Sequence, residues 1–333
     1  MKKLSIIIII IAVITACLPS CSAGAPYSEG EGELNVVASS FIPFDFARAV
    51  TGGKAKITVL QTSGADIHDY TPTTASLGAI AKADVFICIG GLSDDAWIDA
   101  ALKASGNTDV TIIRLLECAD EVLAELEGHN HSAFCEQNHT HNHDGHDHNH
   151  SIDDGHNHVS DEHIWTSPKN AIEAIEKIAK ICAEKDSENG DTYLANAKKY
   201  TDGLAELDKD YETLFAASEH KTLVFADRFP FAHLMHSYGG CYFAAFSGCS
   251  SEISAGFDTV VRLSEAVSHG KIKYVIVTED SDLRLAKSIA DANGCQILTL
   301  NSLQSVSLTQ IKSGITYLDT MKTNLTVLKE ALS

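Results

Sequence analysis

Short apolar runs alternate with stretches of helical period along most of the chain. In the first half, four runs rich in Val, Ile and Phe have the composition of buried strands, at 33–39, 56–60, 84–90 and 109–115. The segments between them, 44–51, 74–83 and 95–105, repeat apolar residues at helical spacing. This order predicts β–α–β units, and therefore a parallel sheet that helices cover on both faces.

The same alternation returns in the second half after two long helical stretches. Ser167 and Pro168 suit the N-cap and first position of a helix over 167–186, and a second helix is predicted over 189–218. Strands are then expected at 221–227, 241–247, 273–280 and 295–300, with helices at 230–239, 257–270, 283–294 and up to residue 333. The fold class predicted is α/β, with two lobes of parallel-rich sheets flanked by helices and joined by one long rigid helix.

We expect an N-terminal lobe at 34–185, a connecting helix at 186–218 and a C-terminal lobe at 219–333. Ligands of such sheets bind in the crevice beyond the carboxyl ends of the strands. In this arrangement the crevice would lie between the lobes.

The N-terminus reads as an export signal. Lys2 and Lys3 precede an apolar segment, 4–16, that is too short to span a bilayer. Small residues then precede Cys17, and a similar pattern precedes Cys21; both resemble the lipidation sites of bacterial lipoproteins, and Cys17 fits better. We expect a signal peptide at 1–16, a flexible tether at 17–33 and a lipid anchor on the outer face of the cytoplasmic membrane. An ordinary cleaved signal peptide and a periplasmic protein are the alternative.

An acidic, histidine-rich insert is predicted at 118–162, and its centre, 129–158, holds ten of the sixteen histidines with five acids and no Lys or Arg. These histidines are His129, His131, His139, His141, His143, His146, His148, His150, His156 and His158. The segment has too few apolar residues for their burial to offset the conformational entropy lost on ordering. We therefore expect a mobile loop. Neutral imidazole is a common ligand of transition metals, and the composition therefore predicts loose metal collection.

Charge and motifs narrow the function classes. The formal net charge is −20, which argues against a nucleic-acid partner. The chain has no H-E-x-x-H, G-x-S-x-G or P-loop motif, so neither an enzyme nor a nucleotide-driven protein is indicated. We expect a monomer.

Two histidines outside the insert stand at positions suited to a site. His68 lies after the strand predicted at 56–60 and before a helix, and His163 lies just before the helix that Pro168 opens. Taken singly, each is more compatible with a satisfied loop histidine than with a metal ligand.

Their surroundings are similar to a known family. "GADIHDYTPT" at 64–73 resembles the G-x-D-P-H-x-Y-x-P signature of the zinc and manganese ABC-transporter substrate-binding lipoproteins. "DEHIWTSPKNA" at 161–171 resembles that family's D-P-H-x-W-x-x-P-x-N-A, and a His-rich loop between the two motifs resembles its zinc-specific members. The resemblance implies one divalent ion bound between two lobes, His68 and His163 as ligands, and an ABC permease with its ATPase as partners.

The second half departs from the family pattern. A gapless alignment puts Arg228 at the family's third ligand position, and Arg cannot ligate a cation. Asp227 is adjacent and could replace it, while His233 and His236 lie in the following helix, one suited to the core and one to the surface. The family's late acid falls near Asn301 and Gln304, which are uncharged. Glu279 and Asp280, at the end of the preceding strand, are the alternative acids.

The expected cargo is zinc, because Zn²⁺ favours imidazole whereas Mn²⁺ prefers more oxygen ligands. Mn²⁺ and Ni²⁺ stay open as alternatives. Two other functions stay open as well: a metal-buffering or adhesive surface lipoprotein that uses only the His-rich loop, and a zinc-dependent hydrolase built on His163 and its neighbour Glu162.

Overall fold

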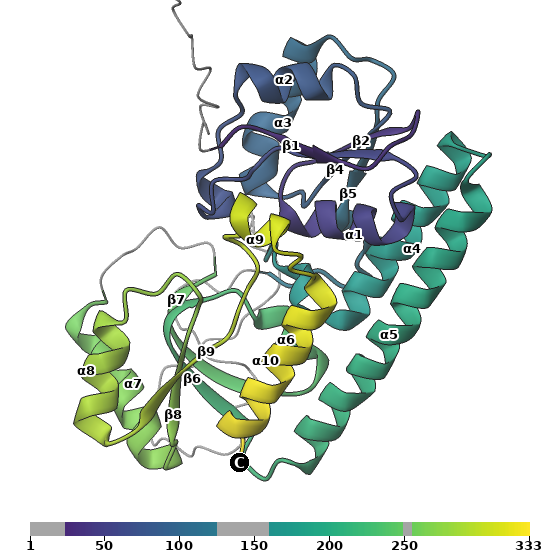
Figure 1. Cartoon of the computed structure of the whole chain (residues 1–333). Coiled ribbons are helices and arrows are strands. Elements are labelled where there is room, and N and C mark those ends of the chain that lie inside the picture. The colour runs from purple at the N-terminus through teal and green to yellow at the C-terminus, as the bar shows by residue number, and fades with distance from the viewer. Residues whose placement is uncertain (1–23, 125–159, 249–254) are drawn as a thin grey trace, which may run out of the picture.

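Two β-sheets, one in each half of the chain, organise the molecule (Figure 1). The structure is a computed structural model, and it describes residues 24–124, 160–248 and 255–333. The strands are β1 (Tyr27–Glu29), β2 (Asn35–Ala38), β3 (Lys56–Val59), β4 (Val85–Cys88), β5 (Thr111–Arg114), β6 (Thr222–Phe229), β7 (Cys241–Ser247), β8 (Tyr274–Val277) and β9 (Gln296–Thr299). Their order is β1-β3-β2-β4-β5 in the first sheet and β7-β6-β8-β9 in the second. The paired strands are parallel except for β1 with β3.

Helices cover both faces of each sheet. They are α1 (Phe41–Thr51), α2 (Thr74–Ile80), α3 (Leu92–Ser105), α4 (Pro168–Lys185), α5 (Gly190–Ala217), α6 (Ala232–Ser237), α7 (Phe257–Gly270), α8 (Arg284–Asn293), α9 (Leu308–Lys312) and α10 (Tyr317–Ala331). α2 and α3 pack on one face of the first sheet, and α1 with α4 and α5 on the other. α7 and α8 cover one face of the second sheet, and α5, α6 and α10 the other. The predicted α/β class with parallel-rich sheets is confirmed.

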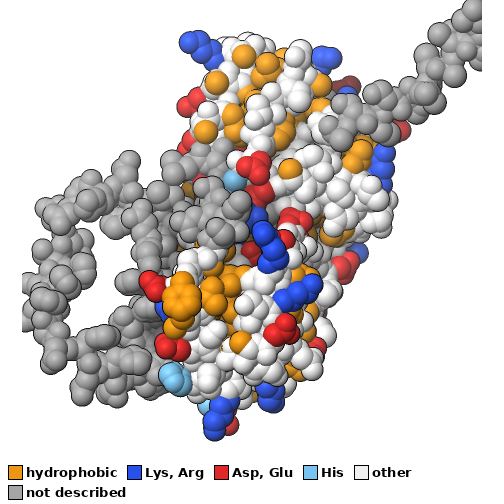
Figure 2. Space-filling model, turned by 90° about the vertical axis from the view of Figure 1, so that its left-hand side faces the viewer, with side chains coloured by type: hydrophobic (Ala, Val, Ile, Leu, Met, Phe, Trp, Pro, Cys, Tyr) orange, Lys and Arg blue, Asp and Glu red, His pale blue; other side chains and the backbone are white. Residues whose placement is uncertain are grey.

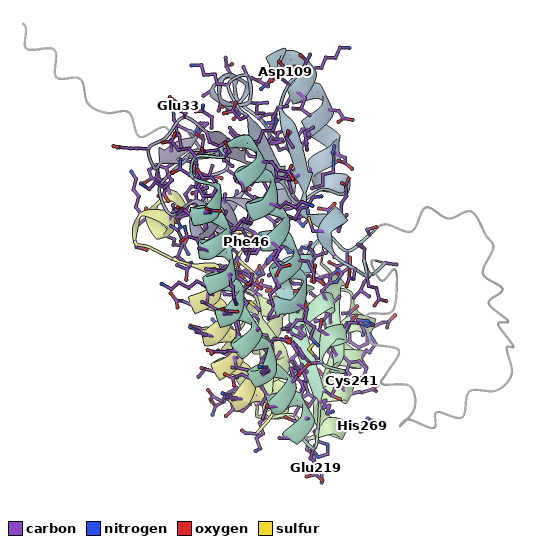
Figure 3. All side chains as sticks on the ribbon, turned by 90° about the vertical axis from the view of Figure 1, so that its right-hand side faces the viewer. Glu33, Phe46, Asp109, Glu219, Cys241 and His269 are labelled. Atoms are coloured by element: carbon purple, nitrogen blue, oxygen red, sulfur yellow. The ribbon has the colours of Figure 1, made fainter. Side chains whose placement is uncertain are left out.

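The long helix α5 is fastened to both lobes. Its buried residues recur at helical spacing, from Tyr193 near its start to Phe215 near its end. Asn196 Nδ2 donates a hydrogen bond to the carbonyl of Val50 in α1 at 3.0 Å, and Tyr211 OH donates to the carbonyl of Met321 in α10 at 2.8 Å. Figure 3 shows α4 and α5 running side by side along the molecule, with α5 ending near Glu219. One hydrophobic core therefore extends continuously through both lobes.

Strand β1 corrects part of the predicted tether at 17–33. Residues 27–29 pair antiparallel with β3, and Ser28 Oγ lies 2.8 Å from Thr58 Oγ1. The Tyr27 ring meets the Phe44 ring edge-on, with centroids 6.5 Å apart. Tyr27 thus fixes this short segment to the sheet, although the Gly- and Glu-rich residues around it gave no strand pattern.

Several predicted features lie outside the described residues. They include the apolar segment 4–16, Cys17 and Cys21, and the ten histidines of 129–158. The two ends of the undescribed segment 125–159 are joined, because Ala124 and Ser160 form an antiparallel bridge. Within the described ranges, every helix is too short or too polar to cross a membrane.

Candidate metal centre between the lobes

His68 is held by a tight turn beyond the carboxyl end of β3. It sits in the 3₁₀ turn Ile67–Asp69, where the Asp66 carboxylate accepts a hydrogen bond from His68 N at 3.0 Å. Gly64, with a φ of +73°, brings this loop against the C-terminal lobe, since a Cβ there would lie 3.0 Å from the Ser307 side chain. An antiparallel bridge joins Ser63 to Ser307 beside it. The loop that carries His68 is therefore fixed to both lobes.

His163 is completely buried and is oriented by a carboxylate. One oxygen of Asp161 accepts hydrogen bonds from His163 N at 2.9 Å and from His163 Nδ1 at 2.8 Å. This fixes the proton on Nδ1 and leaves Nε2 facing the space between the lobes, as a carboxylate does behind a metal-bound histidine. Gly248, at the end of β7, makes room for the ring, because a Cβ there would lie 2.8 Å from His163 Cε1.

The two histidines meet. His68 Nε2 lies 3.4 Å from His163 Nε2. Gln304, in the loop after β9, brings its side-chain amide to both of them: the Nε2 position is 2.6 Å from His163 Nε2 and 3.2 Å from His68 Nε2. Two residues of the N-terminal half and one of the C-terminal half thus converge beyond the carboxyl ends of the strands, where α/β sheets place their ligands.

The protein shifts the pKa values of the two imidazoles in opposite directions. Burial, aided by the neighbouring charge of His163, lowers the pKa of His68 to about 4, so His68 is neutral at pH 7. Burial also disfavours charge on His163, but the Asp161 carboxylate outweighs it and raises the pKa of His163. His163 in turn lowers the pKa of Asp161 against the effect of burial. His68 is therefore a ready neutral ligand, and a cation that binds His163 Nε2 must displace any proton held there.

Arg228 makes an ion pair across the lobes. Its Nη1 donates to Asp66 Oδ2 at 2.7 Å, and Asp66 is the residue whose other oxygen caps the His68 turn. The Arg228 side chain is 30% exposed and that of Asp66 is 8% exposed. Figure 2 shows acidic, basic and histidine side chains gathered between the two lobes on this side of the molecule. The Arg228 guanidinium thus stands at the position where the resemblance placed a metal ligand. It acts on His68 through Asp66.

Glu279 braces the loop that carries Gln304. One of its oxygens accepts from Ser302 N at 2.7 Å and the other from Ser302 Oγ at 2.8 Å. Burial raises the pKa of Glu279, and the hydrogen bonds from Ser302 oppose that shift. Both oxygens of Glu279 are therefore used to hold Ser302, two residues before Gln304.

The Asp227 carboxylate likewise accepts hydrogen bonds from groups of the second sheet. A β-bulge between Phe225 and Arg228 breaks the register of β6 with β7 and turns Asp227 toward β8. Its carboxylate accepts from Thr278 N at 3.2 Å, from Thr278 Oγ1 at 2.9 Å and from Arg228 N at 2.9 Å. Among the described residues, no three His, Cys, Asp or Glu side chains form a metal-binding group. The structure thus brings His68 and His163 together without gathering Asp227 or Glu279 around them.

We therefore predict that Asp227→Asn acts on stability more than on metal affinity. The amide keeps one acceptor but loses charge in a partly buried network, so the free energy of unfolding should fall by about 1–2 kcal/mol. Zinc affinity should change less than twofold. Urea unfolding and zinc titration of the same preparation measure both quantities. A large loss of zinc affinity at unchanged stability would contradict this and make Asp227 a ligand.

Of the two histidines of α6, one is buried and the other is exposed, as the sequence suggested. His233 is buried, and its Nε2 contacts the carbonyl of Asp161 at 3.1 Å. His236 is 42% exposed and lies 3.3 Å from Glu121 Oε2. His233 therefore supports the segment that holds His163.

Residues 36–331 match the protein family described as zinc-uptake complex component A, periplasmic. The zinc-binding protein AdcA of Streptococcus pyogenes is 26% identical over 308 residues, which cover 90% of this chain and 56% of AdcA. The chain thus spans about half the length of that relative. The high-affinity zinc uptake system protein ZnuA of Bacillus subtilis is 26% identical over 99% of this chain and 98% of its own length.

Solved structures show the same architecture. The zinc-bound ZnuA-like domain of Streptococcus pneumoniae AdcA is similar with a TM-score of 0.68 at 25% identity, covering 90% of this chain and 99% of that domain. The sequence match spans both lobes and includes every residue placed at the centre above. This chain belongs to the family of periplasmic A components of zinc-uptake complexes.

Proposed function

We propose that this protein captures zinc outside the cytoplasmic membrane, holds one ion between its lobes and delivers it to an ABC permease whose ATPase supplies the energy. The observation that carries the proposal is the 3.4 Å approach of His68 Nε2 to His163 Nε2, with the Gln304 amide against both. Two ring nitrogens so close, in a buried place, have the spacing of atoms that share one small cation.

The chemistry of the site favours zinc. Zn²⁺ binds imidazole nitrogen at about 2.0–2.1 Å, whereas Mn²⁺ is better served by sites dominated by oxygen. Asp161 stands directly behind His163, and Glu162 Oε2 lies 3.8 Å from His68 Nδ1. These carboxylates balance the charge of a cation held by neutral ligands. Ni²⁺ also favours imidazole, and competition between metals decides between them.

The family relation supports transport rather than buffering or hydrolysis. Zinc uptake is in the description of the family and in the name of the Bacillus subtilis relative, and AdcA is named a zinc-binding lipoprotein in Streptococcus pneumoniae. We infer for this chain a lipid anchor at Cys17, or at Cys21, on the outer face of the cytoplasmic membrane. The permease and its ATPase are the inferred partners.

Zinc titration by calorimetry tests the proposal. A transport protein should keep one tightly bound ion when residues 129–158 are deleted. A buffer that uses only the His-rich segment would lose nearly all binding in that variant. A hydrolase would turn over a substrate, which the transport protein should not do.

The ten histidines of 129–158, outside the described residues, are proposed to collect zinc for the tight site. The segment that holds them leaves at Ala124 and returns at Ser160, three residues before His163. Ions held weakly by this segment would therefore be concentrated close to the centre.

Deleting residues 129–158 should remove several weak zinc equivalents at pH 7.5 and leave the tight one. In the intact chain the same equivalents should disappear at pH 5.5, because an imidazole with a reference pKa of about 6.5 is then protonated and cannot ligate. Equilibrium dialysis at the two pH values measures the stoichiometry. A variant with all ten histidines changed to asparagine keeps the length and serves as the control. Equal stoichiometry of intact and deleted chains at pH 7.5 would exclude the segment from zinc binding.

A further inference from the structure

Glu162 departs from the family pattern and is buried. The pattern that residues 161–171 resemble has Pro at its second position, where this chain has Glu162. The Glu162 side chain is only 2% exposed; it precedes His163 in sequence and approaches His68 in space. Burying a carboxylate costs free energy unless its surroundings favour the charge. The contacts of Glu162 therefore indicate what its charge does.

The N-terminus of α3 accommodates one end of the Glu162 side chain. Gly91 is the N-cap of α3 with a φ of +90°, and a Cβ there would lie 2.7 Å from Glu162 Oε1. Asp94, in the first turn of α3, fixes this loop, since its Oδ2 accepts from Ile89 N at 2.7 Å and from Gly90 N at 3.0 Å. The positive end of a helix dipole stabilises a carboxylate beside it. The α3 terminus therefore offsets part of the cost of burying the Glu162 charge.

The other oxygen of Glu162 faces the ring of His68. Glu162 Oε2 lies 3.8 Å from His68 Nδ1, whereas the second ring nitrogen, His68 Nε2, approaches His163 Nε2. A neutral imidazole that binds a metal through Nε2 carries its proton on Nδ1. A carboxylate beside Nδ1 favours that tautomer and makes the ring a stronger ligand.

The C-terminal lobe brings positive charge to this side of the centre. The Arg228 guanidinium pairs with Asp66, the acid that caps the His68 turn. The charge of Asp66 is therefore balanced by a cation already, whereas a zinc ion held by neutral imidazoles needs negative charge nearby. Glu162 supplies such a charge from the N-terminal lobe, next to the ring of His68.

We propose that Glu162 is the positioning residue of His68: it favours the ring with its proton on Nδ1, and its charge offsets that of Arg228 when zinc is bound. This inference rests on the proposed function and names a supporting residue of the same site. Asp161 stands behind His163 in the same way. The three consecutive residues 161–163 thus supply one ligand and the carboxylates behind both histidines.

Chelator competition on the intact chain, which gives the Kd of the tight site, tests this role. Glu162→Gln keeps the shape of the side chain and removes its charge, so the zinc Kd should rise by roughly the 10- to 100-fold that is usual for a residue behind a ligand. Glu162→Pro, which restores the residue of the family pattern, should raise the Kd at least as much. Glu219→Gln removes the same charge at an exposed position after α5 (Figure 3); it is the matched control and should match the natural protein.

Nuclear magnetic resonance of the zinc-bound chain with ¹⁵N-labelled histidine separates positioning from a general effect on the fold. The Nδ1–H of His68, identified by its loss in His68→Ala, should resonate downfield and exchange slowly with water, because the Glu162 carboxylate attracts its proton. Glu162→Gln should move this signal upfield and speed its exchange. The Nδ1–H of His163, which Asp161 holds, should change little.

The outcomes separate this inference from the proposed function. An unchanged Kd in a folded Glu162→Gln protein would overturn the role of Glu162 and keep the site. A raised Kd with an unchanged His68 Nδ1–H signal would overturn it as well, because Glu162 would then act on the fold and not on the ring. Unchanged zinc binding in both His68→Ala and His163→Ala would instead remove the interlobe site, and with it the proposed function.

Discussion

Zinc affinity should fall by at least about 100-fold when either His68 or His163 is replaced by alanine, because each change removes a ligand, and residues one layer behind a ligand already account for about 10- to 100-fold. The loss should be larger for His163. Its ring is completely buried, and alanine there would leave the Asp161 carboxylate without the imidazole it orients. His68 is partly exposed, so water can replace its nitrogen at lower cost.

Calorimetry on a background lacking residues 129–158 measures the tight site without the weak ones. His269→Ala is the matched control, since His269 is an exposed histidine of α7 in the C-terminal lobe (Figure 3) and should leave the Kd unchanged. Because a buried histidine can also support folding, His163→Gln is paired with His163→Ala, and circular dichroism confirms that both are folded. Folded His68→Ala and His163→Ala proteins that bind zinc normally would exclude these residues as ligands.

The fold class followed from local patterns because both sheets are built from short buried runs with helices between them. Within the run 84–90, residues 85–89 are all apolar, as expected for a strand covered on both faces, and β4 is completely buried. β1 was missed because a three-residue edge strand carries almost no periodic signal. Its position depends on contacts with Phe44 and Thr58, which are distant in sequence.

Half of the candidate site was predictable for a similar reason. His68 and His163 stand in turns marked by local motifs, and the structure brings them together. The functions of Asp227 and Glu279 depend on partners in other strands and loops, Thr278 and Ser302, which sequence alone does not place beside them. Gln304 was named for its position but carries no charge, so its approach to the two histidines became visible only in three dimensions.

Arg228 should weaken zinc binding in the natural protein, and removing its charge should strengthen it. Burial is the main reason for the low pKa of His68, but the positive charges of His163 and Arg228 add to it. A charge that disfavours a proton on His68 also disfavours a divalent cation bound to that ring. Arg228 also has an opposite effect that favours zinc binding, because it holds Asp66 and, through Asp66, the His68 turn. Exposed ion pairs typically contribute about 0.2–1 kcal/mol, and this pair is partly exposed, so we expect the repulsion to dominate.

Arg228→Gln should therefore lower the zinc Kd by about tenfold, which corresponds to about 1.4 kcal/mol. Arg228→His should lower it further, because the imidazole would stand where the resemblance places a ligand. The gain should shrink as salt rises, since a charge effect at a partly exposed side chain is screened. Arg284→Gln, on the exposed surface of α8, removes the same charge as a control and should change the Kd little. Weaker binding in Arg228→Gln would contradict this expectation. It would show that the Arg228–Asp66 ion pair, which holds the His68 turn, favours zinc binding by more than the charge of Arg228 opposes it.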